Sequence, residues 1–217
     1  MSAYPIRFES DFVERRSRLT TFFRILLAIP QLLVVGLYGV AALVVVIIAW
    51  FALLITGRWP AGMYSFTAGY LRWATRAIGY TLLLTDAYPP FSPDEHPDYP
   101  VRLHVAPPQD EYSRLKVLLR MFYVIPAYIA QIVLYYFAEL IALASWVVIV
   151  ITGKQPAGLQ KLIAFSLSYY QRTMGLMLLL TETYPPFEDT PALPPGPEVP
   201  GGLEVGSPQA SGSSSMP

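Results

Sequence analysis

The stretch Thr56-Gly57-Arg58-Trp59-Pro60-Ala61-Gly62 occurs again 96 residues later, as Thr152-Gly153-Lys154-Gln155-Pro156-Ala157-Gly158. At the same offset, residues 18–91 share 25 of 74 positions with residues 114–187. Many of the shared residues are arginine, proline, glycine, tryptophan or tyrosine, so a common apolar composition does not explain the match. A repeat of this length decides the architecture before any local pattern does. The chain therefore divides into repeat 1, a linker, repeat 2 and a tail, at 4–91, 92–98, 99–187 and 188–217.

The composition indicates a membrane protein. Of 217 residues, 54% are hydrophobic and 14% are charged, against about 25% charged in soluble domains, and the mean hydropathy is +0.43. The 15 basic and 15 acidic residues balance, which argues against a nucleic-acid partner. The tail is rich in proline, glycine, serine and acidic residues, so we predict that it is disordered.

Each repeat contains one long apolar run, at 25–55 and at 121–151. As a single helix the run would extend about 46 Å, against a hydrocarbon core of about 30 Å. Two alternatives remain open. In the first, Pro30 and Pro126 break the helix, so that only the part after each proline crosses the membrane. In the second, the run folds back as a helical hairpin that turns near Gly36–Gly39 in repeat 1.

A second helix candidate follows in each repeat, at 63–85 and 159–181. Its apolar residues recur at steps of three and four and form one face, and Arg76 or Arg172 lies in the polar stripe opposite. This helix either lies on the membrane surface or crosses the membrane with its arginine turned inward.

Both alternatives give an even number of spans, and an even number predicts parallel repeats related by an axis along the membrane normal. We predict an all-α integral membrane fold with two parallel tandem repeats, about four membrane-embedded helices and amphipathic segments. Short alternating segments at 4–8 and 99–105 suggest a small two-stranded extramembrane sheet. Basic residues before both apolar runs place the termini in the cytoplasm.

Four arginines and one carboxylate are candidates for lipid or partner contacts. Glu139 is the only charged residue between 121 and 151, and it either binds a proton or cation, pairs with an arginine, or is simply solvated or protonated. Arg76 and Arg172 match across the repeats and either hold lipid phosphates or anchor their helices. Arg24 and Arg120 precede the two apolar runs and suit an anionic leaflet.

Known catalytic patterns are missing from the sequence. It contains no HExxH, GxSxG, P-loop or GxGxxG motif, and we expect no catalytic residue, cofactor or metal. His96 lies in the acidic segment Asp94-Glu95-His96-Pro97-Asp98, which we interpret as a solvated turn rather than a metal site.

Several motifs resemble a bacterial membrane-protein family that is catalogued as a domain of unknown function and often occurs in tandem. They include Arg-x-Arg-Leu-x-x-Phe-Phe-Arg at 16–24, Thr-Gly-Arg-x-Pro at 56–60 and Leu-Leu-Thr-Asp-x-Tyr-Pro-Pro-Phe at 83–91. The resemblance implies a multi-pass protein of the bacterial cytoplasmic (inner) membrane. Repeat 2 departs from the pattern, with Gln155 in place of Trp59 and Ser168 in place of Arg72. No activity comes with the resemblance.

We therefore expect a non-enzymatic scaffold or accessory subunit of a larger membrane complex. Its partners would be the lipid bilayer, including anionic lipids, and other membrane-protein subunits, with no nucleic acid. One alternative is a small lipid- or solute-handling protein with a polar path near Glu139, Arg76 and Arg172. Another is a membrane-shaping hairpin protein.

Overall fold

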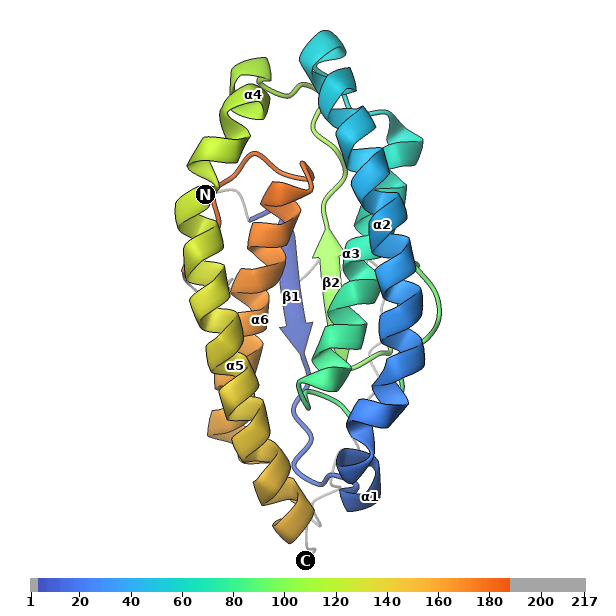
Figure 1. Ribbon diagram of the computed structural model, residues 1–217, viewed down its shortest axis with the longest axis vertical. Coiled ribbons are helices and arrows are strands. Elements are labelled where there is room, and N and C mark those ends of the chain that lie inside the picture. The colour runs from blue at the N-terminus through green and yellow to red at the C-terminus, as the bar shows by residue number, and fades with distance from the viewer. Residues whose placement is uncertain (1–3, 188–217) are drawn as a thin grey trace, which may run out of the picture.

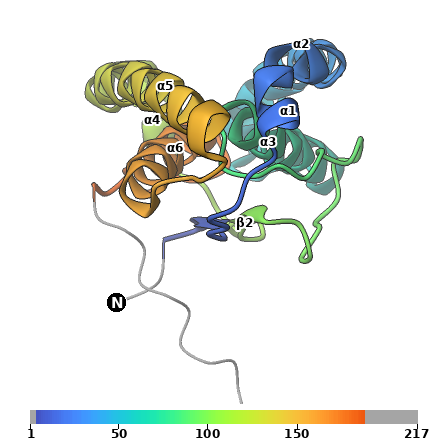
Figure 2. The same cartoon turned by 90° about the horizontal axis from the view of Figure 1, so that it is seen from below.

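The computed structural model describes residues 4–187 in three layers (Figures 1 and 2). The predicted tail lies outside the described residues. The outer layer consists of helices α1 (Arg18–Phe22), α2 (Arg24–Thr56), α4 (Arg114–Tyr123) and α5 (Ile125–Thr152). The middle layer consists of helices α3 (Ala61–Thr81) and α6 (Ala157–Met177). Strands β1 (Ile6–Ser10) and β2 (Val101–Val105) form the third layer.

The two strands pair antiparallel, which confirms the predicted two-stranded sheet. Phe8 lies opposite Leu103, and Ile6 lies opposite Val105. Phe8 and Leu103 occupy equivalent positions in the two repeats, 95 residues apart. A local two-fold axis therefore passes through this pair, and it relates repeat 1 to repeat 2.

Reciprocal contacts between the repeats show how the long helices are oriented. The indole nitrogen of Trp146, near the end of α5, donates to the carbonyl oxygen of Thr21 in α1 at 3.0 Å. Trp50, near the end of α2, donates in the same way to Val117 in α4 at 3.2 Å. The start of each repeat thus lies beside the end of the other repeat's long helix.

The prediction of parallel repeats is therefore wrong, because α2 and α5 run in opposite directions (Figure 1). The reason lies in the sheet. Each strand leads into the helices of its own repeat, so antiparallel pairing of β1 with β2 reverses one repeat relative to the other.

Each strand packs on a middle-layer helix of the other repeat, β1 on α6 and β2 on α3. Glycines make this close approach possible. A Cβ atom at Gly175 would lie 1.8 Å from Cδ1 of Ile6, and one at Gly79 would lie 2.9 Å from Cγ1 of Val101. The repeats are consequently interlocked rather than placed side by side.

The long helix of repeat 1 is continuous. Pro30 lies inside α2, where it removes one helical hydrogen bond, and there is no hairpin turn near Gly36. The break comes earlier, at Phe23 in repeat 1 and at Val124 in repeat 2. A helix break at the proline is therefore found in repeat 2, where Pro126 lies in the first turn of α5, but not in repeat 1. The hairpin that membrane shaping required is missing from the described residues.

The middle-layer helices are largely buried within the protein, so they are not the exposed surface helices of the first alternative, and their arginines are turned inward. Both faces of α3 are covered, by α2 on one side and by β2 on the other. Arg76 and Tyr80 are buried in α3, as Arg172 is in α6. In each repeat the middle layer therefore keeps these arginines away from the exposed apolar surface of the long helix.

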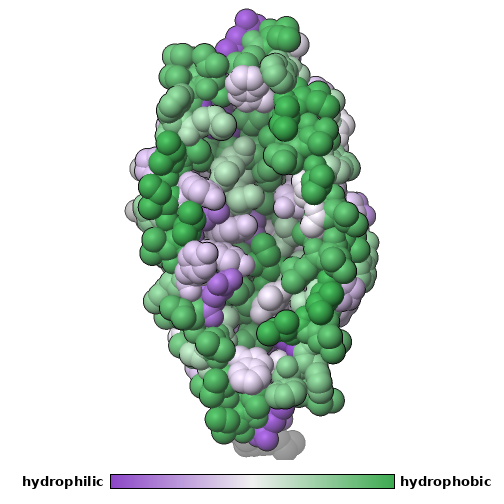
Figure 3. Space-filling model, in the orientation of Figure 1, coloured by the Kyte–Doolittle hydropathy of each residue, from purple (hydrophilic) through white to green (hydrophobic). Residues whose placement is uncertain are grey.

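The outer layer exposes most of its apolar side chains on one face (Figure 3). Two hydrophobic ridges follow α5 and α2, with a hollow of mixed polarity between them. Within residues 4–187, α2 and α5 are the two helices long and apolar enough to cross a membrane, with 17% and 28% of their most apolar windows buried. About four membrane-embedded helices were predicted, and α3 and α6 do not meet this criterion. The buried residues of α2 form a narrow stripe: Arg24, Ala28, Gln31, Val35, Ala42, Ala49 and Leu53.

Candidate functional site

Two clefts lie in the apolar face, and the two-fold axis relates them. The Arg24 cleft has a volume of about 390 Å³, and the Arg120 cleft has a volume of about 360 Å³. Equivalent residues line both, because Arg24 corresponds to Arg120 at the 96-residue offset. The other matched pairs are Ile25 with Met121, Leu83 with Leu179, Leu143 with Ile47, and Trp146 with Trp50.

The floor of each cleft holds a leucine in an unusual backbone conformation. Leu83 has a φ of 66° and Leu179 a φ of 64°, in the left-handed region that glycine normally occupies. They follow the ends of α3 and α6, where the next residue donates back to the helix, from Leu84 to Gly79 and from Leu180 to Gly175, at 2.9 Å in both cases. Such a conformation costs about 1 kcal/mol or more for a residue with a side chain. Both repeats tolerate this strain at the same place.

In the Arg24 cleft both terminal nitrogens of the guanidinium have acceptors. Nη1 of Arg24 donates to the carbonyl oxygens of Tyr80 at 2.7 Å and Thr85 at 2.6 Å. Nη2 forms an ion pair with Asp86. Asp86 also accepts a hydrogen bond from the backbone nitrogen of Ser17, the residue that caps α1, at 2.8 Å. One carboxylate therefore joins the start of α1 to the buried arginine.

The Arg120 cleft lacks this arrangement. Nη1 of Arg120 donates to the carbonyl oxygen of Leu176 at 2.6 Å. Glu182, the counterpart of Asp86, accepts from the backbone nitrogen of Ser113 at 2.7 Å and pairs with Lys116 at 3.6 Å. Arg120 is only 4% exposed, yet its Nη2 has no hydrogen-bond partner within the described residues. The Tyr123 hydroxyl lies within reach of the guanidinium and the Glu182 carboxylate acts on it through space, but neither pairs with Nη2 as Asp86 pairs with Nη2 of Arg24.

The lining of the clefts also differs at two positions. The Arg24 cleft contains Glu139 and Tyr135, which are its acidic and phenolic groups. At the equivalent positions of repeat 1 stand Leu43, which lines the Arg120 cleft, and Gly39. Glu139 is exposed on α5. One cleft thus carries a carboxylate in its wall, and the other is apolar apart from its arginine.

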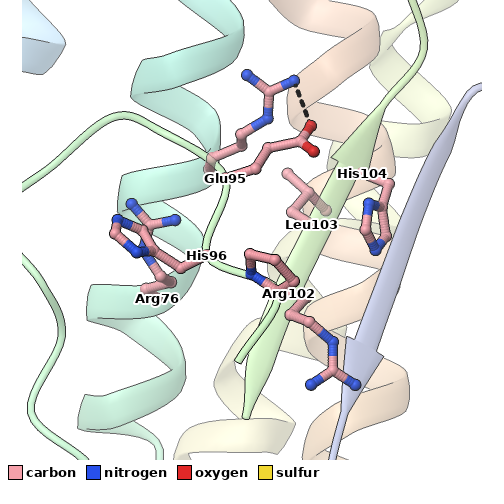
Figure 4. A pocket seen from close by; sticks show the side chains of 8 residues that line it. Arg76, Glu95, His96, Arg102, Leu103 and His104 are labelled. Carbon is pink, nitrogen blue, oxygen red and sulfur yellow. Dashed lines mark ion pairs between the residues drawn. The ribbon is translucent and has the colours of Figure 1, made fainter. Parts of the chain in front are cut away.

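A polar cluster lies on the opposite face, where α3, the linker and β2 meet (Figure 4). Arg72 pairs with Glu95 at 2.8 Å, and Arg102 binds both carboxylate oxygens of Asp11 at 2.7 and 2.8 Å. These hydrogen bonds hold the pKa of Asp11 below its usual range. The cavity among these side chains has a volume of about 30 Å³, enough for about one water molecule. It has no room for a substrate.

Arg76 and Arg172 belong to the sheet side of the middle layer. Arg76 donates to the carbonyl oxygens of Ser92 and, at 2.8 Å, of Asp94. Arg172 donates to the carbonyl oxygen of Pro186 at 3.2 Å, and its guanidinium lies 5.7 Å from the ring centre of Tyr4. Both arginines hold the chain segment that follows their helix.

Of the five predicted contact residues, the structure brings Glu139 and Arg24 together in one cleft and places Arg120 in the other. Arg76 and Arg172 line other cavities than the one that Glu139 lines. Leu83, Leu179, Trp50 and Trp146 also line the clefts, and they were not among the predicted residues. Their match across the repeats was the available signal.

Within residues 4–187, no group of three or more histidine, aspartate and glutamate side chains is placed to hold a metal ion.

Comparison with known families confirms the resemblance of the motifs. A family described as a domain of unknown function, DUF4389, matches twice, at residues 18–92 and 114–188. The two matches cover most of the chain, which therefore belongs to this family. No curated protein and no solved structure matches the chain.

Proposed function

We propose that the chain is a non-enzymatic membrane protein that lies along the plane of the bilayer and serves as a scaffold or accessory subunit of a larger membrane complex. The outer layer of α2 and α5 is immersed in hydrocarbon, and the sheet faces the aqueous phase. The observation that carries the proposal is that the exposed apolar side chains of α2 and α5 lie on one face of the molecule, whereas the ion pairs of Arg102 with Glu9 and Asp11 lie at the sheet on the other face.

An upright orientation conflicts with the position of the sheet. Figure 1 shows the strands midway along the long helices. With α2 and α5 normal to the membrane, Arg102, Asp11 and Glu9 would lie near the bilayer centre on the flank of the protein. Each charged side chain there costs about 2.5–3.5 kcal/mol on insertion scales. In the flat orientation these groups stay in water.

The flat orientation has consequences for topology. The two-fold axis is then parallel to the membrane normal, and α2 and α5 run antiparallel within the membrane plane. Both repeats face the same leaflet, so attachment to one side replaces the expected multi-pass arrangement. The arginines that precede α2 favour the anionic cytoplasmic leaflet of the bacterial inner membrane, with the sheet and linker in the cytoplasm.

The positions of the two Tyr-Pro-Pro-Phe segments support the flat orientation. Tyr88, Phe91, Tyr184 and Phe187 are exposed, and they follow the middle layer in both repeats. Amphipathic aromatic side chains favour the region between hydrocarbon and water. In the flat orientation these matched segments flank the protein at the level of the head groups.

Single-cysteine variants test the orientation without interference, because the chain has no native cysteine. Ile25, Leu37 and Ile55 are 77%, 73% and 73% exposed along α2. With a fluorophore at each position in liposomes, we expect similar depths of quenching by brominated lipids. A label at Leu37 that is much deeper than those at Ile25 and Ile55 would show an upright span and overturn the proposed orientation.

The proposed role as a scaffold is tested separately. After extraction in a mild detergent, we expect the tagged chain to purify with other membrane proteins in fixed proportion. A chain that purifies alone after reconstitution in nanodiscs and again from native membranes would contradict the scaffold role. It would leave the flat orientation standing.

A further inference from the structure

We infer that the Arg120 cleft binds an acyl chain with a single small anionic head group, a carboxylate or phosphate, and that the head group binds Arg120. The inference rests on the part of the proposed function that immerses α2 and α5 in hydrocarbon, because the cleft then opens toward lipid. The Arg24 cleft has the same shape and does not take this ligand.

The walls of the Arg120 cleft suit a hydrocarbon chain. Apart from Arg120, its lining is apolar: Leu43, Val46, Ile47, Trp50, Met121, Val124, Met177 and Leu179. Its volume of about 360 Å³ is within the range of small-molecule sites. It is continuous with the exposed apolar face of α2, so in the proposed orientation a lipid tail enters it without crossing water.

The arginine at the floor calls for an acceptor. A buried cationic group with an unused donor is unfavourable unless an anion or hydrogen-bond acceptor meets it. In repeat 1 Asp86 supplies that acceptor to Arg24. In repeat 2 the corresponding Glu182 is bound to Ser113 and Lys116 instead. A ligand carboxylate or phosphate would do for Arg120 what Asp86 does for Arg24.

The same comparison explains why the site is confined to one cleft. The Nη groups of Arg24 are already bound by Asp86 and by two carbonyl oxygens. Glu139 adds a second carboxylate to that cleft and repels an anionic head group. Leu43 stands at the equivalent position of the Arg120 cleft, so no acidic side chain opposes the ligand there.

Tryptophan fluorescence distinguishes the two clefts, because Trp50 lines one and Trp146 lines the other. Trp59 and Trp73 are common to both single variants, so the difference between the variants reports on the clefts. The probe is brominated dodecanoate, added to the protein in phosphatidylcholine nanodiscs. In Trp146→Phe, which reports on the Arg120 cleft, we expect dodecanoate to quench at least about tenfold more tightly than brominated dodecanol, since a charge-assisted hydrogen bond is lost with the alcohol. In Trp50→Phe we expect no preference for the acid.

Substitutions at Leu43 and Glu139 exchange the acidic and the apolar residue of the two clefts and leave Arg120 in place. In the Trp146→Phe background, Leu43→Glu gives the Arg120 cleft the carboxylate that its counterpart has, and the preference for dodecanoate should disappear. Leu43→Gln should retain it, and Glu139→Leu should leave the Trp50 signal unchanged. Leu43 is 58% exposed, so these variants are expected to fold. Arg120→Gln should abolish the preference as well.

Three results would overturn the inference: equal affinity for dodecanoate and dodecanol, an unchanged preference in Leu43→Glu, or displacement of dodecanoate by inorganic phosphate alone. The last would indicate a site for a free anion. A uniform depth along α2 without a preference for dodecanoate removes this inference and leaves the orientation. An upright span with the preference intact removes the orientation and leaves a lipid site.

Discussion

The two repeats have the same backbone plan and treat their buried arginines differently. Arg24 is bound by Asp86, whereas Arg120 has no carboxylate at hydrogen-bonding distance within the described residues. Two changes account for this. Glu182 is one methylene longer than Asp86, and Lys116, in place of Thr20, pairs with it. A duplicated fold can therefore keep its helices and strands while one copy closes a polar site and the other leaves it open.

Removing each arginine should give the largest contrast between the repeats. Arg24→Gln leaves Asp86 without its cation and frees two carbonyl oxygens, so we expect a loss of about 3 kcal/mol in the free energy of unfolding. Arg120→Gln removes one hydrogen bond and an already unsatisfied donor, so we expect about 1 kcal/mol. Thermal unfolding in lipid-free detergent, followed by circular dichroism, measures both. Equal losses would contradict the difference that the structure shows between the two sites.

The glycine contacts offer a second contrast. Gly175→Ala places a Cβ atom against Cδ1 of the buried Ile6, and we expect a loss of about 2 kcal/mol through overpacking, even though alanine favours the helix. Ile6→Val removes that atom, so the double variant should recover most of the loss. Gly79→Ala meets Val101, and Ile6→Val should not rescue it. A double-mutant cycle in the same detergent tests this. Rescue of both glycine variants by Ile6→Val would argue against the packing of each strand on a helix of the other repeat.

Converting repeat 2 to the chemistry of repeat 1 should have a smaller effect. The double variant Glu182→Asp and Lys116→Thr restores the Asp86 arrangement around Arg120. We expect a gain of about 1 kcal/mol in stability, because a buried donor acquires its acceptor. The preference for dodecanoate should be lost at the same time. Increased stability with an unchanged preference would show that the ligand does not bind Arg120.

The ion pair between Arg102 and Asp11 at the sheet should give the smallest difference in stability between the repeats. Hydrogen bonds from Arg102 lower the pKa of Asp11, whose counterpart in repeat 2 is Ala106. The folded state therefore stabilises the ionised carboxylate, and this contribution is present at neutral pH and is lost as the pH falls through the acid range. Because the pair is partly exposed, we expect Asp11→Asn to cost about 0.5 kcal/mol at neutral pH and nothing at low pH. Unfolding curves measured across pH check this, and a constant cost would exclude the pairing as its cause.

Local patterns in the sequence predicted the repeats, the apolar runs and both strands. They did not predict the direction of the repeats, because the partner of β1 is a strand about 95 residues away and antiparallel pairing is a tertiary choice. Two prolines at equivalent positions also behave differently: Pro30 lies within α2, and Pro126 lies in the first turn of α5, where a missing backbone N–H is harmless.

The candidate site was predictable only in part for a similar reason. Arg24, Arg120 and Glu139 stand out as charges in or beside apolar runs. Their grouping depends on contacts between distant segments, and the left-handed conformation of Leu83 and Leu179 goes against the preference of leucine. Arg76 and Arg172 match across the repeats because both hold backbone carbonyls, a structural reason that residue identity alone does not reveal.

The crossed packing of strands also has a consequence for biosynthesis. Helix α3 emerges from the ribosome before Val101, the residue that fills the space at Gly79. Likewise β1 is made first but packs on α6, which is synthesised about 150 residues later. Strand β1 must therefore wait for β2 before it can pair, and for α6 before its packing on the helix is complete.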